Sequence, residues 1–191
     1  MTRKPNARRR TAIHEAAHAV IGRALRQVCG PATIVPNREL GEAGHAITAD
    51  PYETLGHWLD VLGRFRGADE MRSIVRARIM TYMAGREAEE VFFGSCAGGD
   101  DEDRRQIALM FDSYPPVATG TEPGEYPIRY EQRLRARTRW LVRRHRAIIE
   151  RIAKMLLESG TLRAEELDAA CESSHGSKAA DGRASSAASR R

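Results

Sequence analysis

Residues 11–28 read TAIHEAAHAVIGRALRQV, and this stretch sets the framework of the fold. Apolar residues recur in it at intervals of three and four, which predicts a helix with one buried stripe. The members of the stripe are Ile13, Ala17, Val20, Ile21, Ala24 and Val28. Cys29-Gly30-Pro31 follows directly and is expected to end the helix.

Two histidines and a glutamate in this stretch form an HExxH motif: His14, Glu15 and His18. Positions four residues apart lie on the same face of a helix, so both imidazoles can reach one metal ion. Glu15 can then contact a metal-bound water, whose pKa zinc lowers to about 7. A carboxylate in that place can take the proton and pass it to a leaving amine. The motif predicts a zinc site suited to peptide hydrolysis, against the alternative of a chance HExxH on an ordinary helix.

The residues alone leave the third ligand open. A catalytic zinc site usually has three protein ligands, and the longer motif HExxHxxGxxH fails because Ala24 stands at the third-histidine position. The candidates are downstream acids and histidines, and the acids among them are Glu89, Glu90 and the run 100–103. Acids at the start of a helix also have a simpler explanation, because they stabilise the positive end of the helix dipole.

The rest of the chain predicts a mainly α fold with a small strand pair. The expected helices cover residues 69–93, 101–112, 129–158 and 163–171, and the expected strands cover 32–35 and 46–48. A proline- and glycine-rich loop is expected at 113–127. We divide the chain into a flexible basic arm (1–10), one domain (11–171) and a disordered tail (172–191).

Composition is that of a soluble protein with a single core. The chain has 191 residues, with 31 Lys and Arg against 26 Asp and Glu. No apolar stretch is long enough to cross a bilayer, and no secretory leader is visible. The three cysteines are widely spaced, which predicts reduced thiols. We therefore expect a cytoplasmic protein without membrane contact.

Several segments together resemble the peptidase domain of FtsH-type ATP-dependent zinc proteases. The segment from Thr11 to Val20 resembles the catalytic helix of that family. The other matching segments are Val35-Pro36 with Gly44-His45-Ala46, Ala84 to Gly94, Gly99 through Asp103 to Ala108, and Ile152 to Leu162. The resemblance covers roughly residues 10–170, and its combined motifs are far more specific than HExxH alone.

The resemblance implies a helical peptidase domain in which His14, His18 and Asp103 hold Zn²⁺ and Glu15 is the general base and acid. Asp101 is the reserve candidate for the third ligand.

Two further positions bear on the resemblance. Glu89 is either a carboxylate that orients an imidazole or a surface residue of its helix. Ala17 stands where the family usually has glycine, and a tightly packed helix would resist the extra methyl group.

The resemblance stops short of the ATPase part of that family. The 191 residues contain no GxxxxGK[ST] phosphate loop. We therefore expect a metalloendopeptidase that hydrolyses unfolded or flexible polypeptides, with any ATPase partner supplied on a separate chain. The sequence leaves the oligomeric state open.

Two alternatives remain. One is a non-catalytic domain of the same fold that acts by binding a partner. The other is a nucleic-acid adaptor, because residues 129–151 carry nine arginines against Glu131 and Glu150. For these arginines we expect a solvated helix face rather than a nucleic-acid surface.

Overall fold

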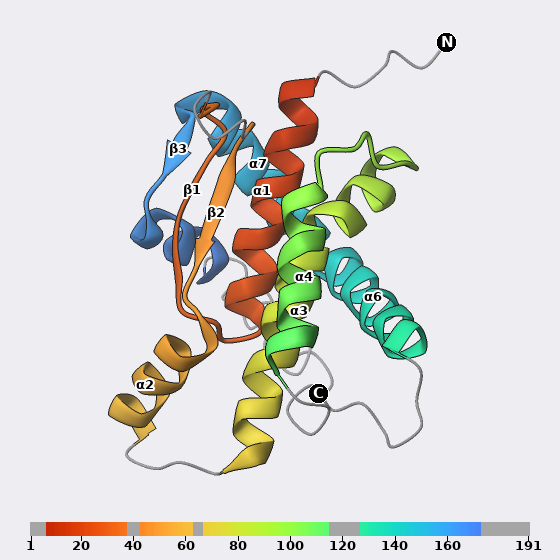
Figure 1. The fold of residues 1–191 in the computed structure, drawn as a ribbon. Helices are drawn as coiled ribbons and strands as arrows, with labels where there is room; N and C mark the ends of the chain where they lie inside the picture. Colours follow the sequence, from red (N-terminus) through yellow and green to blue (C-terminus); the bar gives the residue numbers. More distant parts are fainter. Residues whose placement is uncertain (1–6, 38–42, 63–66, 115–126, 173–191) are drawn as a thin grey trace, which may run out of the picture.

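A computed structural model describes residues 7–37, 43–62, 67–114 and 127–172. Helices dominate it, so the expected mainly α class is confirmed (Figure 1). The helices are α1 (Ala7–Ala24), α2 (Pro51–Leu62), α3 (Ala68–Phe93), α4 (Asp101–Ser113), α6 (Pro127–Arg144), α7 (Arg146–Ser159) and a last helix over 164–172.

Helix α1 runs through the middle of the molecule, between α3, α7 and the sheet (Figure 1). Every residue from Ala12 to Gly22 is buried. The prediction of one buried stripe was therefore too narrow. Neighbouring helices and strands bury this part of the helix on all sides. Small side chains make this close approach feasible, and Ala17 is fully buried in the core, so the helix accommodates its methyl group.

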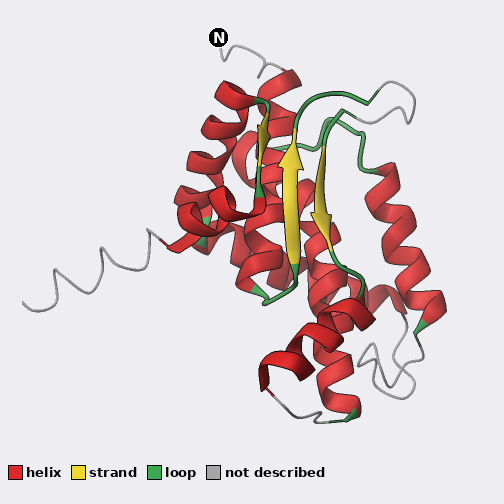
Figure 2. Ribbon diagram, turned by 90° about the vertical axis from the view of Figure 1, so that its left-hand side faces the viewer, coloured by secondary structure: helices red, strands yellow, loops and turns green. Residues whose placement is uncertain are grey.

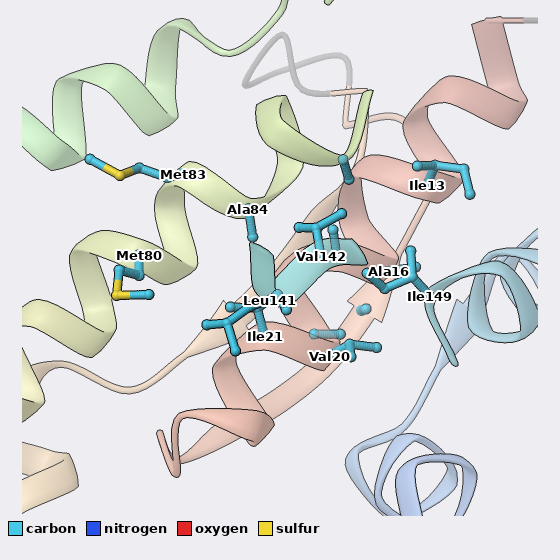
Figure 3. Close-up of a cluster of buried hydrophobic side chains, with 14 of the residues drawn as sticks. Ile13, Ala16, Val20, Ile21, Met80, Met83, Ala84, Leu141, Val142 and Ile149 are labelled. Carbon is cyan, nitrogen blue, oxygen red and sulfur yellow. The ribbon is translucent and has the colours of Figure 1, made fainter. Parts of the chain in front are cut away.

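The core lies where α1 meets α3, α6 and α7, and Figure 3 shows a cluster of its side chains. Ile13 and Ile21 come from α1, Met83 from α3, Val142 from α6 and Ile149 from α7. Each is 1% exposed or less. The periodic apolar residues of the sequence therefore build one continuous core, as a domain of this size requires.

A small antiparallel sheet covers one side of the helices, with the strand order β2-β1-β3 (Figure 2). Its strands are β1 (Cys29–Thr33), β2 (His45–Thr48) and β3 (Thr161–Leu162). The pairing of β1 with β2 is irregular between Cys29 and Ala32, where Gly30 and Pro31 stand. Proline is tolerated in such a bulge. The sequence pattern predicted β1 three residues too late and missed β3, which is only two residues long.

Two helix boundaries differ from expectation. Helix α1 begins at Ala7, so residues 7–10 of the expected arm are helical, and it ends at Ala24 because Arg26 takes a left-handed conformation (φ 60°). The expected helix over 129–158 is two helices separated at His145. Residues 1–6 of the arm, 115–126 of the loop and 173–191 of the tail lie outside the described residues.

Candidate metal centre

Three side chains from two helices meet beside α3. The Nε2 atoms of His14 and His18 lie 3.0 and 3.1 Å from the same oxygen, Oδ2 of Asp103. The imidazole rings stand edge to face, with their centroids 4.7 Å apart. Ligand atoms around a tetrahedral zinc ion lie about 3.3 Å apart if each bond is about 2.0–2.1 Å. The donor set and its spacing therefore fit a zinc ion.

The second nitrogen of each imidazole is held by the protein. His14 donates from Nδ1 to Oε1 of Glu89 over 3.0 Å, and His18 donates from Nδ1 to the backbone carbonyl of Thr81 over 2.7 Å. These bonds fix which nitrogen carries the proton and turn both Nε2 atoms toward Asp103. Both rings are therefore oriented as metal ligands require.

Glu89 is itself fixed on both sides. Its Oε2 accepts hydrogen bonds from the Arg10 guanidinium (3.1 Å) and from the Ala97 backbone N–H (3.0 Å). Arg10 also donates to the Ser95 carbonyl over 2.8 Å. The Glu89 side chain is 5% exposed, which excludes the alternative of a surface residue. The interaction therefore ties the start of α1 to the end of α3 behind the His14 ring.

Gly85 on α3 makes room for the imidazoles. A Cβ atom at this position would lie 2.3 Å from Nε2 of His14 and 2.5 Å from Nε2 of His18. No side chain fits at those distances unless the rings move. Glycine inside a helix is unfavourable by about 0.5–1 kcal/mol relative to alanine. Here the space that it leaves is filled by the two rings.

The electrostatics of the site favour a cation. Burial lowers the pKa of His14, but hydrogen bonds to Asp103 and Glu89 outweigh it and raise this pKa to about 10. The pKa of His18 is also raised, because the attraction of Asp103 overcomes the effect of burial. The two imidazoles in turn hold the pKa of the Asp103 carboxyl well below its usual range, against the effect of burial. In the absence of metal, a proton on His14 therefore supplies positive charge at the site.

Glu15 lies next to this group on α1 and is 6% exposed. Burial raises the pKa of its carboxyl, and the neighbouring imidazoles only partly offset this. Gly44, directly before β2, packs against it: a Cβ on Gly44 would lie 3.1 Å from Cγ of Glu15 and 2.6 Å from the Thr33 carbonyl. Glu15 thus lies between the His14–His18–Asp103 group and the segment that leads into β2.

The acids of the run 100–103 differ in their contacts and exposure. Asp103 reaches the imidazoles, whereas Asp101 is exposed. Asp100 is buried and accepts a hydrogen bond from Arg86 over 3.0 Å. Among the described residues, His14, His18 and Asp103 are the group that could hold a metal ion. The reserve candidate Asp101 is not part of it.

Sequence reasoning missed three supporting groups. The Thr81 carbonyl has no sequence signal, because any residue supplies a carbonyl. Arg10 was assigned to the flexible arm. Gly85 was visible as a glycine inside a predicted helix, which often marks close packing, and that signal could have been used.

No helix in the part of the chain that the structure describes is long and apolar enough to cross a membrane.

Comparison with known proteins gives a consistent but distant relationship. None of the known protein-family models matches the chain. The chain is 31% identical, over 88% of its length, to the ATP-dependent zinc metalloprotease FtsH of Thermus thermophilus. It is 28% identical, over 85%, to the protein of the same name from Thermotoga maritima, and 27% identical, over 85%, to FtsH 4 of Sorangium cellulosum. The chain spans only 28–30% of the length of these relatives. It is thus a distant homologue of one part of FtsH zinc metalloproteases.

Proposed function

We propose that this chain is a zinc-dependent endopeptidase whose metal is held by His14, His18 and Asp103. The observation that supports it most directly is the convergence of the three ligand atoms beside the buried carboxyl of Glu15. The distant homology to zinc metalloproteases points the same way.

The chemistry follows from which groups hold and move protons. Zinc, when bound, would polarise the scissile carbonyl and make an attacking water more acidic. Glu89 and the Thr81 carbonyl keep the two imidazoles in one orientation. Glu15 takes a proton from the attacking water while the oxygen of that water bonds to the carbonyl carbon. It returns this proton to the amine nitrogen when the C–N bond breaks, and its raised pKa suits a group that must hold the proton between the two events.

The substrate would be an extended polypeptide. Strand β2 is at the edge of the sheet, and no described strand pairs with its other side. It begins at His45, next to the Gly44–Glu15 contact, so a peptide added to this edge would pass the reacting groups. Only an unfolded or flexible segment can pair in this way, and the sequence contains no phosphate loop that could drive unfolding.

The test is cleavage of a chemically unfolded, dye-quenched protein by the zinc-loaded chain, with Glu15→Gln as the variant. We expect Glu15→Gln to keep its zinc and to lose activity by about 100-fold or more. Glu158→Gln, an exposed acid on α7, is the matched control and should cleave like the parent. Full cleavage by zinc-loaded Glu15→Gln would refute the proposed role. No cleavage by any zinc-loaded form would favour a non-catalytic domain.

A further inference from the structure

The arginines of α6 lie on two different faces of the helix. Those of the inner face are structural: Arg139 donates to Oε2 of Glu87 over 2.8 Å, and Arg135 donates to the other carboxylate oxygen over 3.4 Å. Glu87 is on α3 and is 1% exposed. Its neighbour Glu90 also accepts from Arg139. These two arginines are therefore needed to neutralise acids between α3 and α6.

The remaining arginines of α6 form a separate surface, which we call the outer stripe. Its members are Arg129, Arg133, Arg137, Arg143 and Arg144, together with Trp140, and all are exposed. At 100° per residue they fall within about 120° of the helix circumference. Among the described residues, no carboxylate forms an ion pair with Arg129, Arg137, Arg143 or Arg144. In Figure 1, α6 lies at the edge of the molecule.

An exposed aromatic ring lies within the outer stripe. Trp140 is 53% exposed, and the Arg144 guanidinium lies over its ring, 5.3 Å from the centroid. Both residues also line a hollow of about 560 Å³ between α1, α6, α7 and the last helix, a size typical of small-ligand sites. Asp168 and Glu172, which lie on the last helix rather than on α6, also line this hollow. The hollow therefore offers the Trp140 ring as a stacking surface.

We propose that the outer stripe binds single-stranded nucleic acid, with phosphates on the arginines and one base against Trp140. Arginine binds phosphate through paired N–H groups and also stacks on flat rings. Proteins that bind single strands combine a row of positive charges with aromatic rings on which bases stack. The outer stripe has both features. The site is separate from the metal centre, and the proposal does not depend on peptidase activity.

The same observations argue against other anionic partners. A membrane-binding helix needs a continuous apolar face, but the apolar residues of α6, such as Leu134 and Leu141, are buried in the core. The large apolar residues of α6 that are exposed are Ile128 and Trp140, which lie about 18 Å apart along the helix. An acidic protein or a duplex would use the charges but would leave the Trp140 face without a stacking partner. A single strand uses both.

The experiment measures binding of a dye-labelled 20-nucleotide single strand to the full chain by fluorescence anisotropy, across a series of salt concentrations. The variant Arg129→Gln/Arg137→Gln/Arg143→Gln removes three charges of the outer stripe. Its matched control, Arg76→Gln/Lys154→Gln/Arg163→Gln, removes three exposed charges elsewhere. Trp140→Ala tests stacking. Circular dichroism checks that all variants fold.

We expect the outer-stripe variant to bind at least tenfold more weakly than the control, with a salt slope reduced by about two. Trp140→Ala should bind the single strand about tenfold more weakly, with an unchanged salt slope. Binding should persist in a zinc chelator. Equal losses in the outer-stripe variant and its control would overturn the proposal, as would no binding at low salt. Tighter binding to a duplex of the same length, to poly-glutamate or to phosphatidylserine vesicles would also overturn it.

Discussion

The candidate metal centre and the outer stripe of α6 both collect charged residues, but they do so in opposite ways. At the candidate metal centre the imidazoles are buried and Asp103 is half-buried, and each side chain is oriented by another group, as His14 is by Glu89. In the outer stripe the charges are exposed, and a helix repeat spaces them. Buried charges must have fixed partners because leaving them unpaired is costly. A buried cluster therefore holds its side chains in fixed positions, as catalysis requires. An exposed row of charges extends along the helix, which suits a long, flexible partner.

The largest effect expected is at Gly85, where the metal centre has no spare room. Gly85→Ala should fold but lose zinc binding, because the new methyl group overlaps the positions of both Nε2 atoms. Gly56→Ala in α2 is the matched control, since a Cβ there meets nothing within 4 Å. It should bind zinc like the parent and raise the free energy of unfolding by about 0.5–1 kcal/mol. Zinc titration and chemical denaturation measure the two outcomes, and a zinc-binding Gly85→Ala would show that the rings are not held as described.

The next effect separates the two candidates for the third ligand. Asp103→Asn should weaken zinc binding by more than about 100-fold, because it removes a charged ligand rather than a supporting group. Asp101→Asn, two residues away and exposed, should change the zinc dissociation constant less than twofold. Competition with a chromogenic chelator measures both. The reverse order would mean that α4 binds the metal through a different residue.

A smaller loss is expected when the support behind His14 is removed. Glu89→Gln should weaken zinc binding by about 10–100-fold, the usual range for groups that orient a metal-binding histidine. Arg10→Met should weaken zinc binding less than Glu89→Gln does, because Arg10 acts on His14 only through Glu89. Arg10→Lys should restore part of the loss. If both Arg10 variants bind like the parent, the link from α1 to α3 does not contribute to the site.

The smallest effect is a gradual one with pH. Without metal, His14 keeps its proton until the pH approaches about 10, so zinc must displace that proton at neutral pH. The apparent zinc affinity should therefore rise about tenfold per pH unit for each proton displaced, between about pH 6.5 and 8. Addition of zinc to the metal-free chain in weak buffer should release at least one proton per chain. A zinc affinity independent of pH would contradict the described electrostatics.

The contrast between the two regions also explains what the sequence could predict. HExxH predicted the positions of His14, Glu15 and His18 on one helix, because helix spacing is local information. Asp103 was placed by resemblance, since nothing local distinguishes it from Asp101. The Thr81 carbonyl and Arg10 could not be assigned, because their roles depend on how α1 crosses α3. The roles of His14, His18 and Asp103 as zinc ligands and of Glu15 as the base stay predictions.

Helix boundaries show the same limit. The pattern predicted α3 and α4 to within a residue, because Gly94 ends one helix and the acidic run begins the other. It predicted one helix where α6 and α7 are separate, since the residues around His145 contain no glycine or proline. It also missed β3, whose two residues pair with β1 from 128 and 130 positions away, Thr161 with Thr33 and Leu162 with Ala32. Such pairing is invisible to local periodicity.

Zinc binding by His14, His18 and Asp103 is best tested by the amount of zinc bound per chain, measured by elemental analysis after purification and zinc supplementation. The His14→Ala/His18→Ala variant is the control. We expect about one tightly bound zinc ion in the parent chain and none in the variant. No tightly bound zinc in the parent, or equal amounts in both, would contradict it.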